Sequence, residues 1–428
     1  MNKFLILFLP ILLLNCSFDT KSGFWTQEKK ITNVNKNIQE LFKEEKKFNK
    51  ELNPNLKLKI DTSNIQNKEF VELYNNSGLS NFNTNIKKKS KFKFSKIENF
   101  NYFEPDLISD GSNFIFFDDK ANLIKFDETT KIIWKKNFYS KSEKKLKPIL
   151  TFALEGNNIV VIDSMGKIYN IDFKTGDLIW SKTNTNPFNS QLKIYKNKIY
   201  AIDMNNVLRC YSLKDGSELW KFNSEDTFLK SKKRNSIAIK NGSVFFNNSL
   251  GDIIAINAES GTLLWQTPTQ SSTIYENAFG LRLSDLVISG EDLLFSNNRN
   301  EFYSLSLVNG VLNWKQKINS SVRPVVIDNL VFTFSEEGYF FLLEKKTGNI
   351  IRVTNIFKST KKKIYPVGFI VGKKEILLST NIGHLLIIDT VSGKTKSILK
   401  IDNGLISRPF IFNNEILLAK DNSIIRLD

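Results

Sequence analysis

The chain is poor in the side chains that most enzymes use for catalysis or metal binding. Its 428 residues include one histidine, His384, and two cysteines, Cys16 and Cys210. A disulfide framework and a multi-histidine metal site are therefore excluded. A Ser-His-Asp or Cys-His site would depend on His384, yet no nucleophile elbow lies near it. Cys210 lies in the apolar run LRCYSL, which predicts a buried core residue; a disulfide with Cys16 is the alternative.

Long hydrophobic runs are also absent beyond the first residues. The run Phe4–Leu14 is too short to span a membrane comfortably and is followed by a cysteine. The sequence LLNC at 13–16 resembles a lipoprotein signal-peptidase site, although Asn15 replaces the usual Gly, Ala or Ser. We therefore predict that residues 1–16 form a lipoprotein signal peptide and that Cys16 is lipidated. Ser17 favours the outer membrane, and an uncleaved anchor is the alternative.

Acidic residues are outnumbered, since 61 Lys and Arg against 44 Asp and Glu give a net charge of +17. Such a balance can indicate an anionic partner such as lipid head groups or nucleic acid. However, Lys, Asn and Ile are abundant along the whole chain, and no arginine-rich or aromatic-basic stripe stands out. The charge is therefore interpreted as a compositional bias, and no nucleic-acid partner is expected.

What the chain does contain is a repeat. Its clearest copy is Gly166–Trp180, GKIYNIDFKTGDLIW, which predicts a strand, a Thr-Gly turn and a second strand ending in tryptophan. Other copies have the same layout with varying completeness: Lys120–Trp134, Asn206–Trp220, Gly251–Trp265, Asn300–Trp314, Gly338–Arg352 and Gly383–Ser397. Their first residues are 38 to 49 residues apart, which leaves room for four short strands per unit. The sequence thus predicts an all-β, eight-bladed β-propeller of four-stranded antiparallel blades; seven blades is the alternative.

The two ends of the propeller are expected to meet. Glu415–Asp428 restarts the repeat and stops before its fourth strand, so an eighth unit is incomplete. Lys91–Ile97 alternates correctly to supply the missing strand, which would remove the open edges. The propeller is therefore assigned to residues 91–428. The repeat tryptophans are expected to pack against neighbouring blades rather than to stack on a ligand.

Residues 17–90 are polar and rich in Asn, Lys and Ser, which predicts a tether. Within it, Asn37–Glu51 has the apolar spacing of a short amphipathic helix. That helix could dock on the propeller or a partner, or it could be marginal within a flexible spacer.

The repeat resembles that of the pyrroloquinoline-quinone-like propellers over residues 91–428. This resemblance covers two branches: the quinoprotein dehydrogenases, and the BamB family of lipoproteins that serve the outer-membrane β-barrel assembly (BAM) machinery. The lipoprotein motif, the chain length and the eight units are similar to the BamB branch. The chain has no adjacent cysteines and no visible calcium loop, which are features of the dehydrogenases. The resemblance therefore implies a scaffold that is not an enzyme, with no cofactor and no metal.

Membership of the BamB branch would also imply a partner surface. Arg282-Leu283-Ser284-Asp285 resembles a family segment whose loop contacts the periplasmic POTRA domains of BamA, although Val287 stands where a second acid is expected. Leu229 and Lys232 match family positions by their spacing from Trp220. A loop salt bridge that fixes the turn is the alternative role for Arg282 and Asp285. We expect a monomer within a complex with BamA and other BAM components. A quinoprotein enzyme and a propeller that binds cell-wall components are the competing hypotheses.

Overall fold

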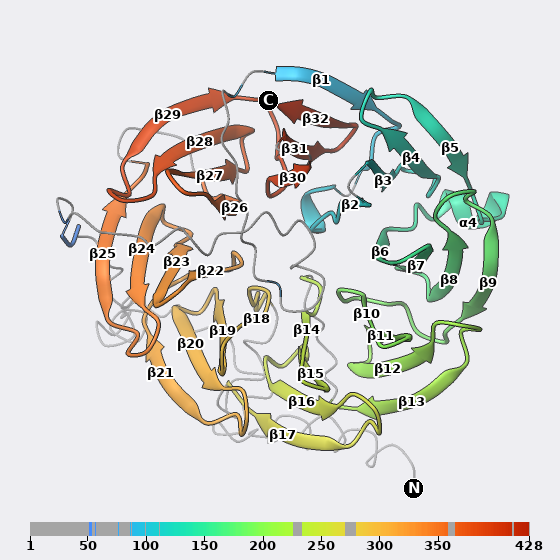
Figure 1. Ribbon diagram of the computed structural model, residues 1–428, viewed down its shortest axis with the longest axis horizontal. Coiled ribbons are helices and arrows are strands. Elements are labelled where there is room, and N and C mark those ends of the chain that lie inside the picture. Colours follow the sequence, from blue (N-terminus) through green and yellow to red (C-terminus); the bar gives the residue numbers. More distant parts are fainter. Residues whose placement is uncertain are drawn as a thin grey trace, which may run out of the picture. The chain divides into compact units, whose positions relative to one another are not determined.

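The described part of the chain forms a closed ring of eight sheets around a central axis (Figure 1). The computed structural model describes residues 51–53, 56, 76, 86, 88–98, 100–110, 112–225, 233–269, 280–357, 364–412 and 415–427, all within one compact unit, Glu51–Asp428. Every sheet has four antiparallel strands, so the predicted eight-bladed propeller is confirmed. Cys16 and all but the last residue of the predicted helix Asn37–Glu51 lie outside the described residues.

Seven of the eight blades keep the order of the chain from the axis to the rim. The strands of the first four blades are β2 (Ile108–Ser109), β3 (Asn113–Phe117), β4 (Leu123–Asp127), β5 (Ile132–Lys136); β6 (Leu150–Glu155), β7 (Asn158–Asp163), β8 (Lys167–Asp172), β9 (Leu178–Thr183); β10 (Lys193–Tyr195), β11 (Lys198–Ile202), β12 (Val207–Ser212), β13 (Glu218–Asn223); and β14 (Ile237–Lys240), β15 (Ser243–Asn247), β16 (Ile253–Asn257), β17 (Leu263–Thr267). The next three blades comprise β18 (Val287–Ser289), β19 (Asp292–Asn297), β20 (Glu301–Ser306), β21 (Leu312–Gln316); β22 (Val325–Ile327), β23 (Leu330–Phe334), β24 (Tyr339–Glu344), β25 (Ile350–Asn355); and β26 (Pro366–Val371), β27 (Glu375–Thr380), β28 (His384–Asp389), β29 (Thr395–Lys400). Short helices η1 (Phe100–Tyr102) and α4 (Lys141–Lys145) lie in connections. No helix in the described ranges is long and apolar enough to cross a membrane.

The last blade joins the two ends of the propeller. Its strands are β30 (Phe410–Phe412), β31 (Glu415–Lys420) and β32 (Ser423–Leu427), and its rim strand is β1 (Lys88–Lys93). β1 pairs with β32 in antiparallel register over Ser423–Leu427, so the predicted closure is confirmed. The strand begins three residues earlier than the predicted Lys91–Ile97. The backbone N–H groups of Phe94 and Ile97 still donate to the turn before β32, at 3.0 and 2.6 Å.

Consecutive blades are joined by the repeat tryptophans, as the sequence predicted. In each full unit the glycine of the turn has positive φ, and the indole of the preceding blade lies directly against it, as Trp180 does against Gly216. Four indole Nε1 atoms donate to a backbone carbonyl of the next blade, 2.7–3.2 Å away: Trp134 to Phe173, Trp180 to Leu213, Trp265 to Leu307 and Trp314 to Lys345. In the remaining unit, Tyr200 donates instead to the equivalent carbonyl, that of Ala258, at 3.0 Å.

Arg352 stands where the other units carry tryptophan, and it is fully buried. Its guanidinium donates to three backbone carbonyls: that of Val391 in the next blade, and those of Asn53 and Leu56. The last two belong to the described residues before β1 (51–53, 56, 76 and 86), which we call the N-terminal segment. Beside Arg352, Leu52 and Val353 exchange backbone hydrogen bonds, each 3.0 Å long. The N-terminal segment thus extends the β22–β25 sheet at its rim, at a unit in which the repeat has lost its tryptophan.

Apolar residues from the facing sides of consecutive blades form the core. One cluster, for example, combines Val160 and Ile162 of one blade with Ile199 and Ala201 of the next. Cys210 is fully buried in such a cluster, as predicted, and burial raises the pKa of its thiol to about 12.

The contact between indole and glycine predicts a stability difference between two glycines. A Cβ added to Gly216, at φ +70°, would lie 2.5 Å from Trp180 Cε3, whereas a Cβ on Gly242, at φ +76°, meets nothing within 4 Å. Both Gly→Ala variants carry the left-handed backbone cost of about 1–2 kcal/mol. Gly216→Ala should lose a further ~1–3 kcal/mol because it overpacks the blade contact. Denaturant unfolding of both variants measures the difference, and equal losses would contradict the proposed role of the contact.

A second prediction concerns Arg352. Arg352→Met removes three hydrogen bonds that a fully buried guanidinium donates to backbone carbonyls, so the free energy of unfolding should fall by about 1–3 kcal/mol. Proteolysis next to Leu52 should also become faster, since the N-terminal segment loses its clamp. Lys346→Met, at an exposed position of the same blade, is the control. Arg352→Trp restores the repeat residue and should recover stability while the segment stays sensitive to protease. Unchanged proteolysis in both Arg352 variants would contradict this role.

Candidate functional site

The segment Arg282–Asp285 lies between β17 and β18 and is fixed at its start by backbone contacts. The Arg282 N–H donates to Asn298 Oδ1 at 2.8 Å, and the Asn298 N–H donates to the Arg282 carbonyl at 3.1 Å. Leu283 forms an isolated bridge with Asn297, and its side chain is buried in the core between two blades. The resemblance to the BamB segment therefore falls on a packed turn rather than on a freely projecting loop.

Arg282 and Asp285 occupy different environments within this turn. The Arg282 side chain is 46% exposed and pairs with Glu336 at 2.6 Å. Asp285 is only 3% exposed and accepts from Arg323, whose Nε lies 2.7 Å from Oδ2. Burial alone would raise the pKa of Asp285, but Arg323, then Arg234 and Lys233, hold that pKa below its usual value. Arg282 is therefore available to a partner, whereas Asp285 serves an ion pair inside the chain.

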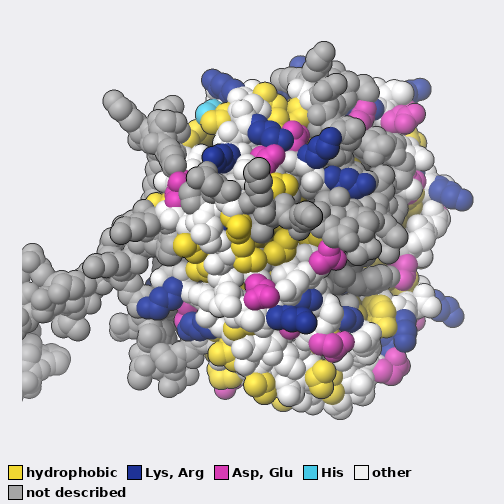
Figure 2. Space-filling view, turned by 60° about the vertical axis from the view of Figure 1, so that its left-hand side comes forward, with side chains coloured by type: hydrophobic (Ala, Val, Ile, Leu, Met, Phe, Trp, Pro, Cys, Tyr) yellow, Lys and Arg dark blue, Asp and Glu magenta, His cyan; other side chains and the backbone are white. Residues whose placement is uncertain are grey.

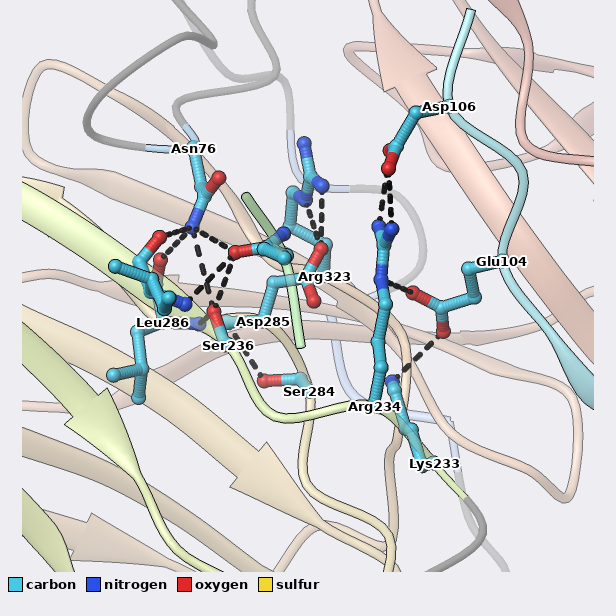
Figure 3. Close-up of polar contacts among 12 residues, drawn as sticks. Asn76, Glu104, Asp106, Lys233, Arg234, Ser236, Ser284, Asp285, Leu286 and Arg323 are labelled. Atoms are coloured by element: carbon cyan, nitrogen blue, oxygen red, sulfur yellow. Dashed lines mark hydrogen bonds and ion pairs between the residues drawn. The ribbon is translucent and has the colours of Figure 1, made fainter. Parts of the chain in front are cut away.

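Asp285 belongs to a group of charged residues around the axis, which we call the axial cluster: Glu104, Asp106, Lys233, Arg234, Asp285 and Arg323. Arg234 forms a forked ion pair with Asp106, and Lys233 Nζ lies 3.0 Å from Glu104 (Figure 3). Burial would lower the pKa of the Arg234 guanidinium, but Asp106, Asp285 and Glu104 raise it. The described cations of the cluster are thus matched by carboxylates from other blades.

The topology explains why these residues meet. Each member of the axial cluster lies just before the innermost strand of a blade: β2, β14, β18 or β22. All innermost strands begin on the same face of the ring, because each blade repeats the same strand order. We call this the entry face. Glu336 follows β23, which runs antiparallel to β22, so Arg282 meets its partner on this face as well.

Two of the predicted partner-binding residues cannot be placed. Leu229 and Lys232 lie outside the described residues, within the connection from β13 to β14. Lys232 directly precedes Lys233 in the chain, so that connection leads into the axial cluster on the entry face.

The sequence did not single out Arg234, Arg323, Glu104 or Asp106 as site residues. Their shared signal is a charged side chain two to four residues before an innermost strand, as in the SVRP sequence at 321–324. That signal is weak, because the sequence does not show which of these charged residues pair. The pairing depends on how the blades are arranged around the ring.

Basic and acidic side chains are interspersed on the side of the molecule shown in Figure 2, and they form no continuous basic patch there. This arrangement agrees with a compositional origin for the net charge of +17. Over the part of the chain that the structure covers, no three His, Cys, Asp or Glu side chains form a group that could hold a metal ion.

Comparisons with known proteins identify the family. The family model described as outer membrane protein assembly factor BamB matches residues 119–354, more than half of the chain. The outer membrane protein assembly factor BamB of Moranella endobia (strain PCIT) is 21% identical over 270 residues, 62% of this chain and 68% of that protein. Among solved structures, BamB from Moraxella catarrhalis superposes with a TM-score of 0.66 at 13% identity, covering 80% of this chain and 99% of that one. A europium-containing methanol dehydrogenase has a similar fold, with a TM-score of 0.65 at 10% identity over 81% and 88% of the two chains. From the family match and the eight-bladed ring we conclude that the chain belongs to the BamB family of outer membrane protein assembly factors, within the pyrroloquinoline-quinone-like β-propellers.

Proposed function

We propose that the protein is a non-enzymatic scaffold of the BAM machinery that binds BamA and aids the assembly of outer-membrane proteins. In this proposal a lipid on Cys16 holds it at the periplasmic face of the outer membrane. The part of residues 17–90 that precedes Glu51 acts as the tether, because Leu52 and Asn76 contact the propeller and β1 begins at Lys88. The entry face docks on the POTRA domains of BamA through Arg282, Leu229 and Lys232.

The match of the BamB family model to residues 119–354 is the observation that carries the proposal. Two features of the site support it. Arg282 is held by backbone hydrogen bonds and yet keeps 46% of its side chain exposed, so it can contact a partner without first being ordered. The connection that holds Leu229 and Lys232 leads into the axial cluster on the same face. A rigid charged residue near an apolar one is a reasonable centre for an interface, since few residues dominate binding.

A quinoprotein-like dehydrogenase is the second candidate, because a methanol dehydrogenase has the same fold. At 10% identity that likeness concerns the fold alone. Such an enzyme would bind a quinone tightly and depend on calcium, and a propeller that binds cell-wall components would do neither. Affinity purification of the intact lipoprotein from membranes, with identification of the proteins that co-purify, distinguishes the scaffold from both.

Charge reversal on the entry face tests the docking surface. Arg282→Glu and Leu229→Asp should each weaken co-purification with BamA at least tenfold. The first would place a negative charge against the group on BamA that Arg282 attracts, and the second would introduce a charge at an apolar contact. The melting temperature of Arg282→Glu should stay close to that of the unaltered protein, because its pair with Glu336 is partly exposed. The melting temperature of Leu229→Asp, measured alongside, separates lost docking from lost stability. Lys232→Glu should act in the same direction with a smaller effect.

Two further variants serve as controls for this experiment. Lys174→Glu reverses an exposed charge on the β8–β9 turn, at the opposite face, and should leave association unchanged. Asp285→Asn should instead lower stability by about 3–5 kcal/mol, because it removes the charged half of a buried ion pair with Arg323. Unchanged co-purification for all three entry-face variants would place the interface elsewhere.

The anchor is tested separately. Cys16→Ser should leave an unprocessed precursor and abolish metabolic labelling with a radioactive fatty acid, because no other residue can take the lipid. Labelling that survives the substitution would rule out the lipoprotein assignment. Membrane retention without labelling would indicate an uncleaved hydrophobic anchor instead.

A further inference from the structure

Asn76 belongs to the N-terminal segment, and its side chain is almost completely buried at the entry face, with 1% exposure (Figure 3). Its Nδ2 lies within reach of four oxygen atoms: Leu286 O at 2.8 Å, Gln191 Oε1 and Ile237 O at 3.2 Å each, and Ser236 Oγ at 3.4 Å. Its Oδ1 accepts from Lys193 Nζ at 2.7 Å. One side-chain carboxamide therefore meets acceptors at its nitrogen and a cation at its oxygen.

The partners fix the orientation of this carboxamide. The carbonyls of Ile237 and Leu286 can only accept, and the Lys193 ammonium can only donate. Gln191 presents its oxygen rather than its nitrogen, because Oε1 also accepts from the Ile237 N–H at 3.0 Å. The amide of Asn76 thus has one satisfactory orientation, and its two ends are recognised by opposite chemistry.

Three consecutive blades build the surroundings of Asn76. Gln191 and Lys193 belong to the start of β10, Ser236 and Ile237 to that of β14, and Leu286 to that of β18. Ser236 Oγ connects the three, since it donates to Gln191 Oε1 at 3.0 Å and accepts from the Leu286 N–H at 2.9 Å. We call the five residues around Asn76 the acceptor set: Gln191, Lys193, Ser236, Ile237 and Leu286. Contacts among them link the blades without using Asn76, so the acceptor set belongs to the propeller.

We propose that this acceptor set is a peptide-binding site for the side-chain carboxamide of asparagine, and that the chain fills it with its own Asn76. An aspartate would place a carboxylate oxygen 2.8 Å from the Leu286 carbonyl and lose both N–H donors. An apolar side chain would remove the oxygen that accepts from Lys193 Nζ and the N–H donors to the Leu286 and Ile237 carbonyls, and polar sites reject analogues that lack such groups. Asn76 also has φ +58°, a backbone region that asparagine enters more readily than most residues.

The covalent connection makes Asn76 a strong competitor for its own site. A tethered ligand acts at an effective concentration on the order of millimolar, so a free peptide binds only after Asn76 has been removed. The site lies beside the axial cluster, where Asp285 directly precedes Leu286. It does not depend on the proposed function, because no residue of the acceptor set is among the partner-binding residues.

Binding in trans tests the site on the full-length chain. Asn76→Gly removes the carboxamide and keeps the positive φ without strain. A synthetic peptide of residues 70–82, FVELYNNSGLSNF, should bind the Asn76→Gly chain at least tenfold more tightly than the unaltered chain, by calorimetry or fluorescence anisotropy. The same peptide with aspartate in place of Asn76 should bind at least tenfold more weakly, and one with aspartate in place of Asn75 is the matched control that should still bind.

Two outcomes would overturn the proposal: equal affinity of both aspartate peptides for the Asn76→Gly chain, or no binding of the native peptide at millimolar concentration. A second measurement uses the unaltered chain and so does not depend on the folding of a variant. The side-chain amide protons of Asn76, assigned by NMR through their loss in Asn76→Asp, should exchange with solvent more than tenfold slower than those of an asparagine in a free peptide. Exchange at the free-peptide rate would also overturn the proposal.

Discussion

Closure of the ring by β1 and β32 is the constraint on which the other contacts depend. The core lies between consecutive blades, so every blade needs a neighbour on both sides. β1 completes the last blade at its rim, and its Phe92 packs onto the first blade, with ring centroids 4.6 Å from Phe114 and 5.3 Å from Phe126. One strand therefore satisfies the backbone of one blade and the apolar face of the next. Without it, two sheets would expose surfaces that every other blade buries.

The fold could be predicted because the repeat encodes it locally. Most units carry their own strand pattern, turn glycine and rim tryptophan, and the contacts made by these repeat residues reach only the next blade. Arg352 shows where this reasoning ends. In the sequence it is a degenerate copy of the repeat, yet two of its acceptors, Asn53 and Leu56, lie about 300 residues away in the N-terminal segment. The sequence repeat cannot indicate such a contact, because the N-terminal segment that Arg352 binds is not part of the repeat.

The candidate site was predictable only in part, for a related reason. The motif Arg282–Asp285 indicated either a partner-binding loop or a loop salt bridge, and it could not show that Arg282 is exposed while Asp285 is buried. That difference arises from Arg323, which comes from the next blade and donates to Oδ2 of the carboxylate. The two ends of the motif therefore differ: Asp285 forms a buried ion pair, whereas Arg282 forms an exposed one with Glu336, and its role in binding a partner stays a prediction. The residues of the acceptor set around Asn76 were not predicted at all, because backbone carbonyls leave no trace in a sequence.

The entry face combines these features and limits how a partner can bind there. Its buried cations are already matched within the chain: Arg323 by Asp285, Arg234 by Asp106 and Lys193 by Asn76. Taking over any of these groups would require a partner to replace a desolvated contact, which costs far more than adding one at the rim of an interface. Exposed groups such as Arg282 carry no such cost. The net charge of +17 is thus a poor guide to the partners of the chain. Exposed side chains on a face that the blades hold rigid are better candidates for a contact with a partner.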